Sequence, residues 1–131
     1  MSMATGETPW PGVTALLVED HPALRRILSQ TLATLGFEVI ALPDADAART
    51  QIERHGCPAL LFSDVRMPGS MTGIDLARWV RERHPDARIL LQTGYAVGDA
   101  TGFVTITKPF SADQLLEAIQ ATGLPMGRSP G

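Results

Sequence analysis

The sequence predicts an α/β domain with a doubly wound, five-stranded parallel sheet between two layers of helices. Five short apolar runs alternate with segments whose apolar residues recur at helical spacing. The runs are continuous rather than alternating, as expected for strands covered on both faces. Strand–helix–strand units of this kind have right-handed crossover connections and give a parallel sheet. The length of 131 residues suits a single domain.

Each element is expected from its apolar pattern and its end signals. Gly36 ends the first helix, and Asp44 and Ser111 are helix caps. The expected order is a strand at 15–18, a helix with apolar residues from Leu24 to Leu35, a strand at 37–40, a helix at 45–54, a strand at 59–62, a helix from Gly73 to His84, strands at 88–91 and 103–106, and a last helix after Ser111.

The stretch after the fourth strand is unusually short. Only 14 residues separate Thr93 from Lys108, and the fifth strand occupies some of them. The segment 94–102 (GYAVGDATG) contains three glycines, so we expect the fourth helix to be short or missing. Proline and glycine are frequent at both ends of the chain. We therefore expect a folded domain at 13–121 with flexible tails at 1–12 and 122–131.

Composition excludes several classes of function. The net charge of −3 gives no basic excess for binding nucleic acid. A single cysteine, Cys57, can form neither an intramolecular disulfide nor a zinc cluster, which fits a reducing compartment. No apolar run approaches the roughly 18 residues of a membrane span, and the N-terminus lacks the pattern of a secretory signal. The sequence predicts a cytoplasmic protein without a membrane partner.

Polar residues follow the expected strands at their carboxyl ends. Glu19 and Asp20 come after the first strand, Asp64 after the third, Thr93 after the fourth and Lys108 after the fifth. In a doubly wound sheet ligands bind at this edge, near the point where the winding reverses. Three carboxylates there favour a hard cation such as Mg2+, which prefers oxygen ligands. A lysine and a hydroxyl beside them suit a phosphoryl group.

Four segments carry a resemblance to a known family: LLVEDHP, LLFSDVRMPG, LLQTGYA and ITKPFS. In this order they resemble the receiver domain of two-component response regulators, over about 14–121. The resemblance implies a flavodoxin-like, CheY-like three-layer fold. It also implies that Asp64 accepts a phosphoryl group from a phosphohistidine, and that Thr93 and Lys108 contact that group. The implied partners are a sensor histidine kinase or histidine phosphotransfer protein, and an unknown downstream protein.

The same resemblance implies the metal site. Asp20 and Asp64 would bind Mg2+ together with the backbone carbonyl of Arg66, and Glu19 would orient water bound to the metal. The sequence departs from many receivers at Thr105, where an aromatic residue is common. On this interpretation the chain is a signalling phosphoacceptor that assists only its own phosphorylation and dephosphorylation.

Two alternatives remain open. The first is a Mg2+-dependent phosphohydrolase on a similar sheet. Such enzymes commonly carry a second aspartate two residues after the nucleophile, where this chain has Arg66. The second is a pseudo-receiver that acts only as a binding scaffold. Retention of all five polar residues at the strand ends disfavours the scaffold.

Overall fold

The computed structural model describes residues 8–67, 69–94 and 102–127, and its architecture confirms the predicted fold class. The elements in chain order are β1 (Thr14–Val18), α1 (Pro22–Thr34), β2 (Glu38–Leu42), α2 (Ala45–His55), β3 (Leu60–Asp64), α3 (Gly73–Arg83), β4 (Arg88–Thr93), β5 (Val104–Thr107) and α4 (Ala112–Ala121). No helix lies between β4 and β5 among the described residues, and residues 95–101 fall outside them.

All neighbouring strands are parallel, in the order β2-β1-β3-β4-β5. The chain therefore winds from β1 to one edge of the sheet and then, through β3, to the other. Pairing brings the strand ends level: Val18 lies opposite Ser63, and Asp64 lies opposite Gln92. The reversal point between β1 and β3 thus places the residues that follow both strands side by side, which is where such sheets bind ligands.

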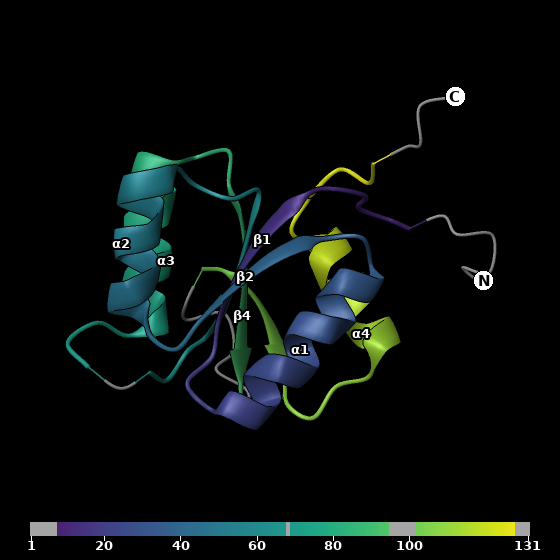
Figure 1. Ribbon diagram of the computed structural model, residues 1–131, viewed down its shortest axis with the longest axis horizontal. Helices are drawn as coiled ribbons and strands as arrows, with labels where there is room; N and C mark the ends of the chain where they lie inside the picture. The colour runs from purple at the N-terminus through teal and green to yellow at the C-terminus, as the bar shows by residue number, and fades with distance from the viewer. Residues whose placement is uncertain (1–7, 68, 95–101, 128–131) are drawn as a thin grey trace.

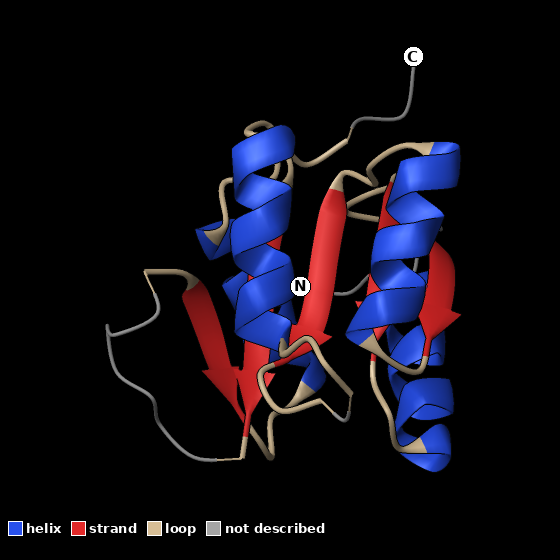
Figure 2. Ribbon diagram, turned by 90° about the vertical axis from the view of Figure 1, so that its left-hand side faces the viewer, coloured by secondary structure: helices blue, strands red, loops and turns tan. Residues whose placement is uncertain are grey.

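Helices cover both faces of the sheet, with α1 and α4 on one side and α2 and α3 on the other (Figures 1 and 2). The alternation of a strand separates the two cores. On β1, Ala15 and Leu17 pack toward α1 and α4, whereas Leu16 and Val18 pack toward α2 and α3. All four side chains are fully buried, which explains the continuous apolar run in the sequence.

Helix starts follow the predicted capping chemistry. The side chains of Asp44 and Ser111 accept hydrogen bonds from the backbone N–H groups of Ala47 and Gln114, at 2.7 and 3.0 Å. Strand bounds differ more. The second strand was expected at 37–40 but spans Glu38–Leu42, because Phe37 instead turns into the core just before the strand begins.

Residues on both sides of the expected domain 13–121 pack against its core, while the prediction of tails at 1–12 and 122–131 stays a prediction. Trp10 is fully buried and stacks on Phe37, with 5.3 Å between ring centroids. A Cβ on Gly36 would lie 2.7 Å from the Trp10 carbonyl. The lack of a side chain at this position, just after α1, therefore leaves room for the backbone of Trp10. Leu124 is buried too, and the Gly127 N–H donates to the Pro9 carbonyl at 2.8 Å.

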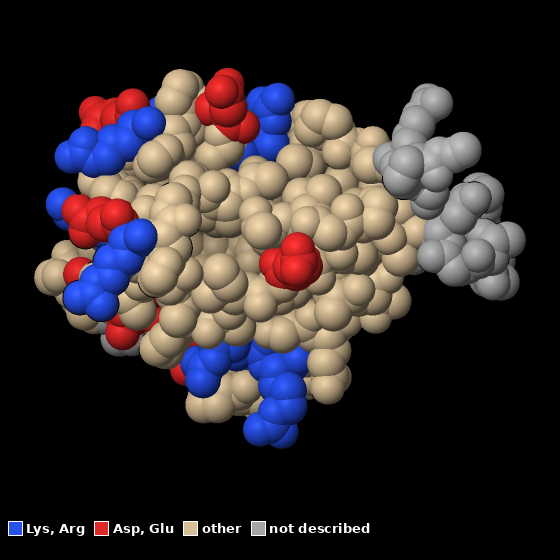
Figure 3. Space-filling view, turned by 45° about the horizontal axis from the view of Figure 1, so that its top comes forward, with Lys and Arg blue, Asp and Glu red and all other residues tan. Residues whose placement is uncertain are grey.

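The described residues contain no membrane-spanning helix, and the face shown in Figure 3 carries charges of both signs. None of the helices within residues 8–67, 69–94 and 102–127 is long and apolar enough to cross a bilayer. On the face shown in Figure 3, basic and acidic side chains lie interleaved and most of the area between them is uncharged.

Candidate functional site

The predicted polar residues gather at the carboxyl edge of the sheet. Glu19 directly follows β1, Asp64 and Thr93 are the last residues of β3 and β4, and Lys108 directly follows β5. Alternation along the strands explains their direction. Leu17, Phe62 and Ile106 pack toward α1 and α4, and the residues two positions later are Glu19, Asp64 and Lys108. The three charged side chains at the ends of β1, β3 and β5 therefore lie on the side of the sheet that α1 and α4 cover.

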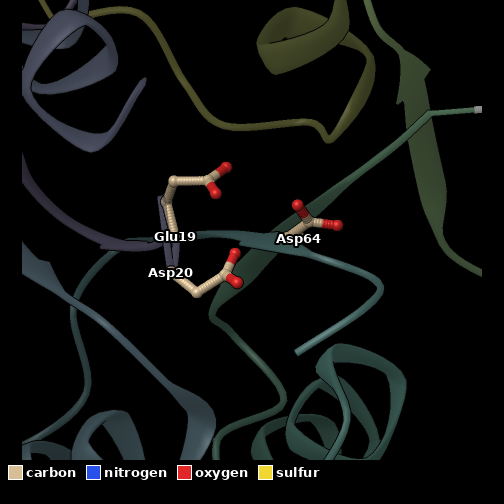
Figure 4. Close-up of side chains that lie close together, drawn as sticks. All are labelled: Glu19, Asp20 and Asp64. Carbon is tan, nitrogen blue, oxygen red and sulfur yellow. The ribbon is translucent and has the colours of Figure 1, made fainter. Parts of the chain in front are cut away.

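Glu19, Asp20 and Asp64 form an acidic cluster, with one oxygen of each lying within 4.8 Å of the others. Figure 4 shows the three side chains gathered around one space at the ends of β1 and β3. Glu19 is 1% exposed and Asp64 is 7% exposed, whereas Asp20 is open to solvent. Clustered carboxylates repel one another, and the donor set consists only of oxygens, so these residues fit a hard divalent cation such as Mg2+.

Lys108 supplies the positive charge of the site. Its Nζ lies 2.7 Å from Asp64 Oδ2 and 3.7 Å from Glu19 Oε1. Partial burial works against its charge, but the hydrogen bond to Asp64 and the attraction of both carboxylates outweigh this and raise the pKa of Lys108. The lysine therefore stays protonated beside the acidic cluster. The Lys108–Pro109 peptide bond is cis.

Asp64 is held by one donor on each carboxylate oxygen. The Arg66 backbone N–H donates to Oδ1 at 3.1 Å, and Lys108 donates to Oδ2. Close packing fixes the backbone beneath it: the Gly73 N–H donates to the Val65 carbonyl at 3.0 Å, and a Cβ on Gly73 would overlap the Asp64 carbonyl oxygen. Each carboxylate oxygen keeps a second lone pair for a metal ion or an electrophile.

Glu19 is the most enclosed acid of the cluster. Its Oε2 accepts from the His21 backbone N–H at 3.1 Å, and its Oε1 accepts from Gln92 Nε2 at 3.0 Å. The Arg25 guanidinium donates to its carbonyl at 2.9 Å. Burial, assisted by the charge of Asp64, raises the pKa of Glu19, although the His21 N–H and Lys108 oppose this. A cation beside this carboxylate would offset the unfavourable burial of its negative charge.

Comparison with known proteins now assigns the family. The family described as the response regulator receiver domain matches residues 15–120, which is most of the chain. This chain belongs to the response regulator receiver family. The match confirms the predicted resemblance, the fold class and the assignment to two-component signalling.

Curated relatives of this receiver include proteins of very different length. It is 38% identical to the response regulator protein FleR of Pseudomonas aeruginosa over 88% of this chain, but over only 25% of FleR. It is 30% identical to the chemotaxis protein CheY of Bacillus subtilis over 82% of this chain and 94% of CheY. The receiver thus spans about a quarter of the length of FleR, but nearly all of a single-domain relative.

Solved structures support the same fold. A response regulator receiver protein from Sinorhizobium medicae superposes with a TM-score of 0.78 at 26% identity, covering 85% of this chain and 94% of that one. The response regulator TrrA of Thermotoga maritima, solved in complex with Mg2+ and a beryllium fluoride, gives a TM-score of 0.74 at 26% identity, covering 84% and 98%.

Within this receiver the structure brings together Glu19, Asp20, Asp64 and Lys108, as predicted. Thr93 is buried at the same edge, and its carbonyl accepts from the Lys108 backbone N–H at 2.7 Å. For Arg66 the structure describes a backbone N–H contact with Asp64, while metal binding by its carbonyl stays a prediction. Two further residues contact Glu19 and were not predicted: Arg25 and Gln92. The sequence shows Gln92 as a polar residue directly after the apolar run of Ile89, Leu90 and Leu91, next to Thr93.

Proposed function

We propose that this receiver accepts a phosphoryl group on Asp64, with Mg2+ as cofactor, and signals by binding partner proteins. One observation carries the proposal. In this receiver, Lys108 Nζ lies 2.7 Å from Asp64 Oδ2, and an oxygen of Asp64 lies within 4.8 Å of an oxygen of Glu19 and of Asp20. That arrangement places a nucleophile beside a lysine and beside carboxylates that fit Mg2+, and both cations would neutralise the negative charge of a transferred phosphoryl group.

The chemical step needs no general base, because an ionised carboxylate has no proton to lose. A carboxylate oxygen of Asp64 attacks the phosphorus of a phosphohistidine. The phosphorus–nitrogen bond breaks, its electron pair returns to the imidazole nitrogen, and that nitrogen takes up a proton. The products are an aspartyl phosphate and a neutral histidine. The Arg66 N–H and Lys108 hold the carboxylate in place from both oxygens.

Charge neutralisation is the main task of the remaining residues. Bound Mg2+, which Glu19, Asp20, Asp64 and the Arg66 carbonyl would hold directly or through water, supplies positive charge at the phosphoryl oxygens. Lys108 turns from the carboxylates to the transferred group, and the Thr93 hydroxyl donates to it. The added charge thus changes which groups Lys108 and Thr93 contact, and a phosphorylation switch acts through such local changes.

The family supports the proposed partners. Receivers interact with histidine kinases and downstream effectors, so the proposed phosphoryl donor is a sensor histidine kinase or a histidine phosphotransfer protein. We propose a cytoplasmic location on the same basis. One relative, NtrC of Salmonella typhimurium, is described as a DNA-binding transcriptional regulator, but this chain spans only 23% of it. We propose that the receiver itself contacts no nucleic acid, in line with its net charge of −3.

Intact-mass spectrometry tests the proposal directly. The purified chain is incubated with acetyl phosphate and MgCl2, and one phosphoryl adduct is expected. Asp64→Asn should remove the adduct, because an amide is a poor nucleophile. EDTA should also remove it, because without Mg2+ the negative charge of the phosphoryl group is not neutralised. Asp86→Asn is a matched control: it changes an exposed aspartate outside the site and should leave the adduct intact.

The alternatives give different results in the same assay. A scaffold would form no adduct under any condition. A phosphohydrolase would release inorganic phosphate continuously from varied phosphate esters, without a stable adduct. Either outcome would overturn the proposed function.

A further inference from the structure

Gln92 is an unusual residue for its position. It is fully buried on β4, where Ile89, Leu90 and Leu91 precede it, and its neighbour two positions back, Leu90, belongs to the core between the sheet and α1 and α4. The side-chain Oε1 of Gln92 is buried and has no hydrogen-bond partner among the described residues. Burying a carbonyl without a partner is unfavourable, and a leucine would avoid it. The amide is therefore kept for what its Nε2 contacts.

The only hydrogen bond described for this side chain points at the acidic cluster. Gln92 Nε2 donates to Glu19 Oε1 at 3.0 Å, and both side chains are buried. A carboxylate accepts only from the amide nitrogen, so the carboxylate dictates which way the amide faces and leaves Oε1 unpaired. The hydrogen bond to the charged oxygen compensates for the unpaired carbonyl.

The backbone of Gln92 acts on the other half of the cluster. Its carbonyl accepts from the Val65 N–H at 2.9 Å, directly after Asp64, and Asp64 is its partner in the β3–β4 register. One residue thus holds the end of β3 through its main chain and the Glu19 carboxylate through its side chain. Gln92 therefore sets the spacing between two of the three acids.

Lys108 cannot take over this task. It lies 3.7 Å from Glu19 Oε1 but 2.7 Å from Asp64, and a transferred phosphoryl group would draw it further from Glu19. The other oxygen of Glu19 accepts from the nearby His21 N–H. Gln92 Nε2, at 3.0 Å, is thus the nearer of the two donors to Glu19 Oε1.

We propose that Gln92 is a positioning residue of the metal site, which orients Glu19 toward the bound cation and so sets the affinity for Mg2+. This inference rests on the proposed function, since it concerns the same acidic cluster. Groups that orient metal-site carboxylates commonly change metal affinity by tenfold or more when removed. Gln92 does not touch the phosphoryl group, so its removal should weaken Mg2+ binding without slowing phosphorylation once Mg2+ saturates.

The test compares Gln92→Met, which keeps the length and loses the N–H donor, with Gln30→Met, the same change on the exposed face of α1. Isothermal titration calorimetry gives the Mg2+ Kd, and adduct formation from acetyl phosphate is measured across Mg2+ concentrations. For Gln92→Met we expect a Kd raised about tenfold and a rate at saturating Mg2+ within about twofold of wild type. Gln30→Met should match wild type in both.

A double-mutant cycle separates positioning from packing. In a Glu19→Ala background, which has no side-chain oxygen for Gln92 to orient, Gln92→Met should cause no further loss of Mg2+ affinity. A Kd for Gln92→Met within twofold of wild type, or an equal loss in both backgrounds, overturns the inference while leaving the proposed function intact. A wild type that binds no Mg2+ overturns the proposed function instead, and the inference with it.

A measurement on the wild type covers the case in which Gln92→Met fails to fold. The side-chain amide protons of Gln92 are observed by NMR during Mg2+ titration. They should shift together with the Glu19 signals as the cation binds, and an unchanged Gln92 amide overturns the inference.

Discussion

The two ends of the sheet bury different chemistry. At the carboxyl ends of β1, β3 and β4 lie the buried polar and charged residues described in the structure: Glu19, Ser63, Asp64, Gln92 and Thr93. At the amino end, the segment before β1 contributes Trp10, which stacks on Phe37. Apolar burial stabilises a fold directly, whereas buried polar groups stabilise it only when paired.

The comparison shows how the receiver separates stability from chemistry. Substitutions at the amino end should change the free energy of unfolding and leave the site chemistry alone. At the carboxyl end, the chain tolerates a buried carboxylate whose pKa is raised and an amide carbonyl that has no hydrogen-bond partner among the described residues. These features are unfavourable for folding, so relieving them should stabilise the protein and impair the site.

The largest effect is expected from Trp10→Ala. Removing this fully buried ring leaves a cavity against Phe37 and should lower the free energy of unfolding by about 3–5 kcal/mol. Urea denaturation measures it. Ile27→Ala is the control: this side chain is 57% exposed and its loss should change stability by about 0.5 kcal/mol or less. Similar losses for both variants would mean that Trp10 belongs to a loose tail after all.

An intermediate effect is expected where the two regions meet. Gly73→Ala places a Cβ onto the Asp64 carbonyl, so α3 must shift away from the end of β3. We expect a loss of about 1–3 kcal/mol, despite the better helix propensity of alanine, together with slower phosphorylation. Gly94→Ala is the stability control, because its Cβ meets nothing within 4 Å and should change stability by about 0.5 kcal/mol at most. Equal effects would contradict the close packing at Gly73.

The smallest effect has the opposite sign. In the folded protein burial raises the pKa of Glu19, so the folded state binds its proton more tightly than the unfolded state does. Stability from this group is therefore lost as pH rises from the ordinary glutamate value through the raised one. In EDTA, Glu19→Gln should raise the free energy of unfolding by on the order of 1 kcal/mol at pH 7, a size typical of single substitutions. At about pH 4 it should change the free energy of unfolding little.

Denaturation at both pH values checks this prediction. A glutamine has a single acceptor oxygen, so it loses one of the hydrogen bonds from Gln92 and the His21 N–H at both pH values, and the difference between pH 7 and pH 4 isolates the charge. A loss of stability at pH 7 would show that the carboxylate is paired well enough to stabilise the metal-free fold.

The fold and most of the site were predictable because their signals are local. Continuous apolar runs mark buried parallel strands, and residues directly after such strands must meet at one edge, which places Glu19, Asp64 and Lys108 together. Trp10 was not predictable in this way. It lies among prolines and glycines that resemble a tail, and its burial depends on Leu35 and Gly36, more than twenty residues later in the sequence.

Gln92 escaped prediction for a related reason. A single amide next to Thr93 reads as a strand-terminal polar residue, and its role appears only when strand pairing sets it opposite Asp64 and beside Glu19. Local patterns identify which groups carry the chemistry. The groups that hold them in place are set by tertiary contacts.

The hydrogen bond between Gly127 and Pro9 has a consequence for how this domain can be joined to other modules. The chain enters and leaves the fold at nearly the same point, next to the amino ends of the strands and away from Asp64. Closely spaced termini permit insertion of a whole domain into a host loop, or circular permutation with a short linker. A fluorescent protein or affinity tag fused at either terminus should therefore leave the approach to the acidic cluster open.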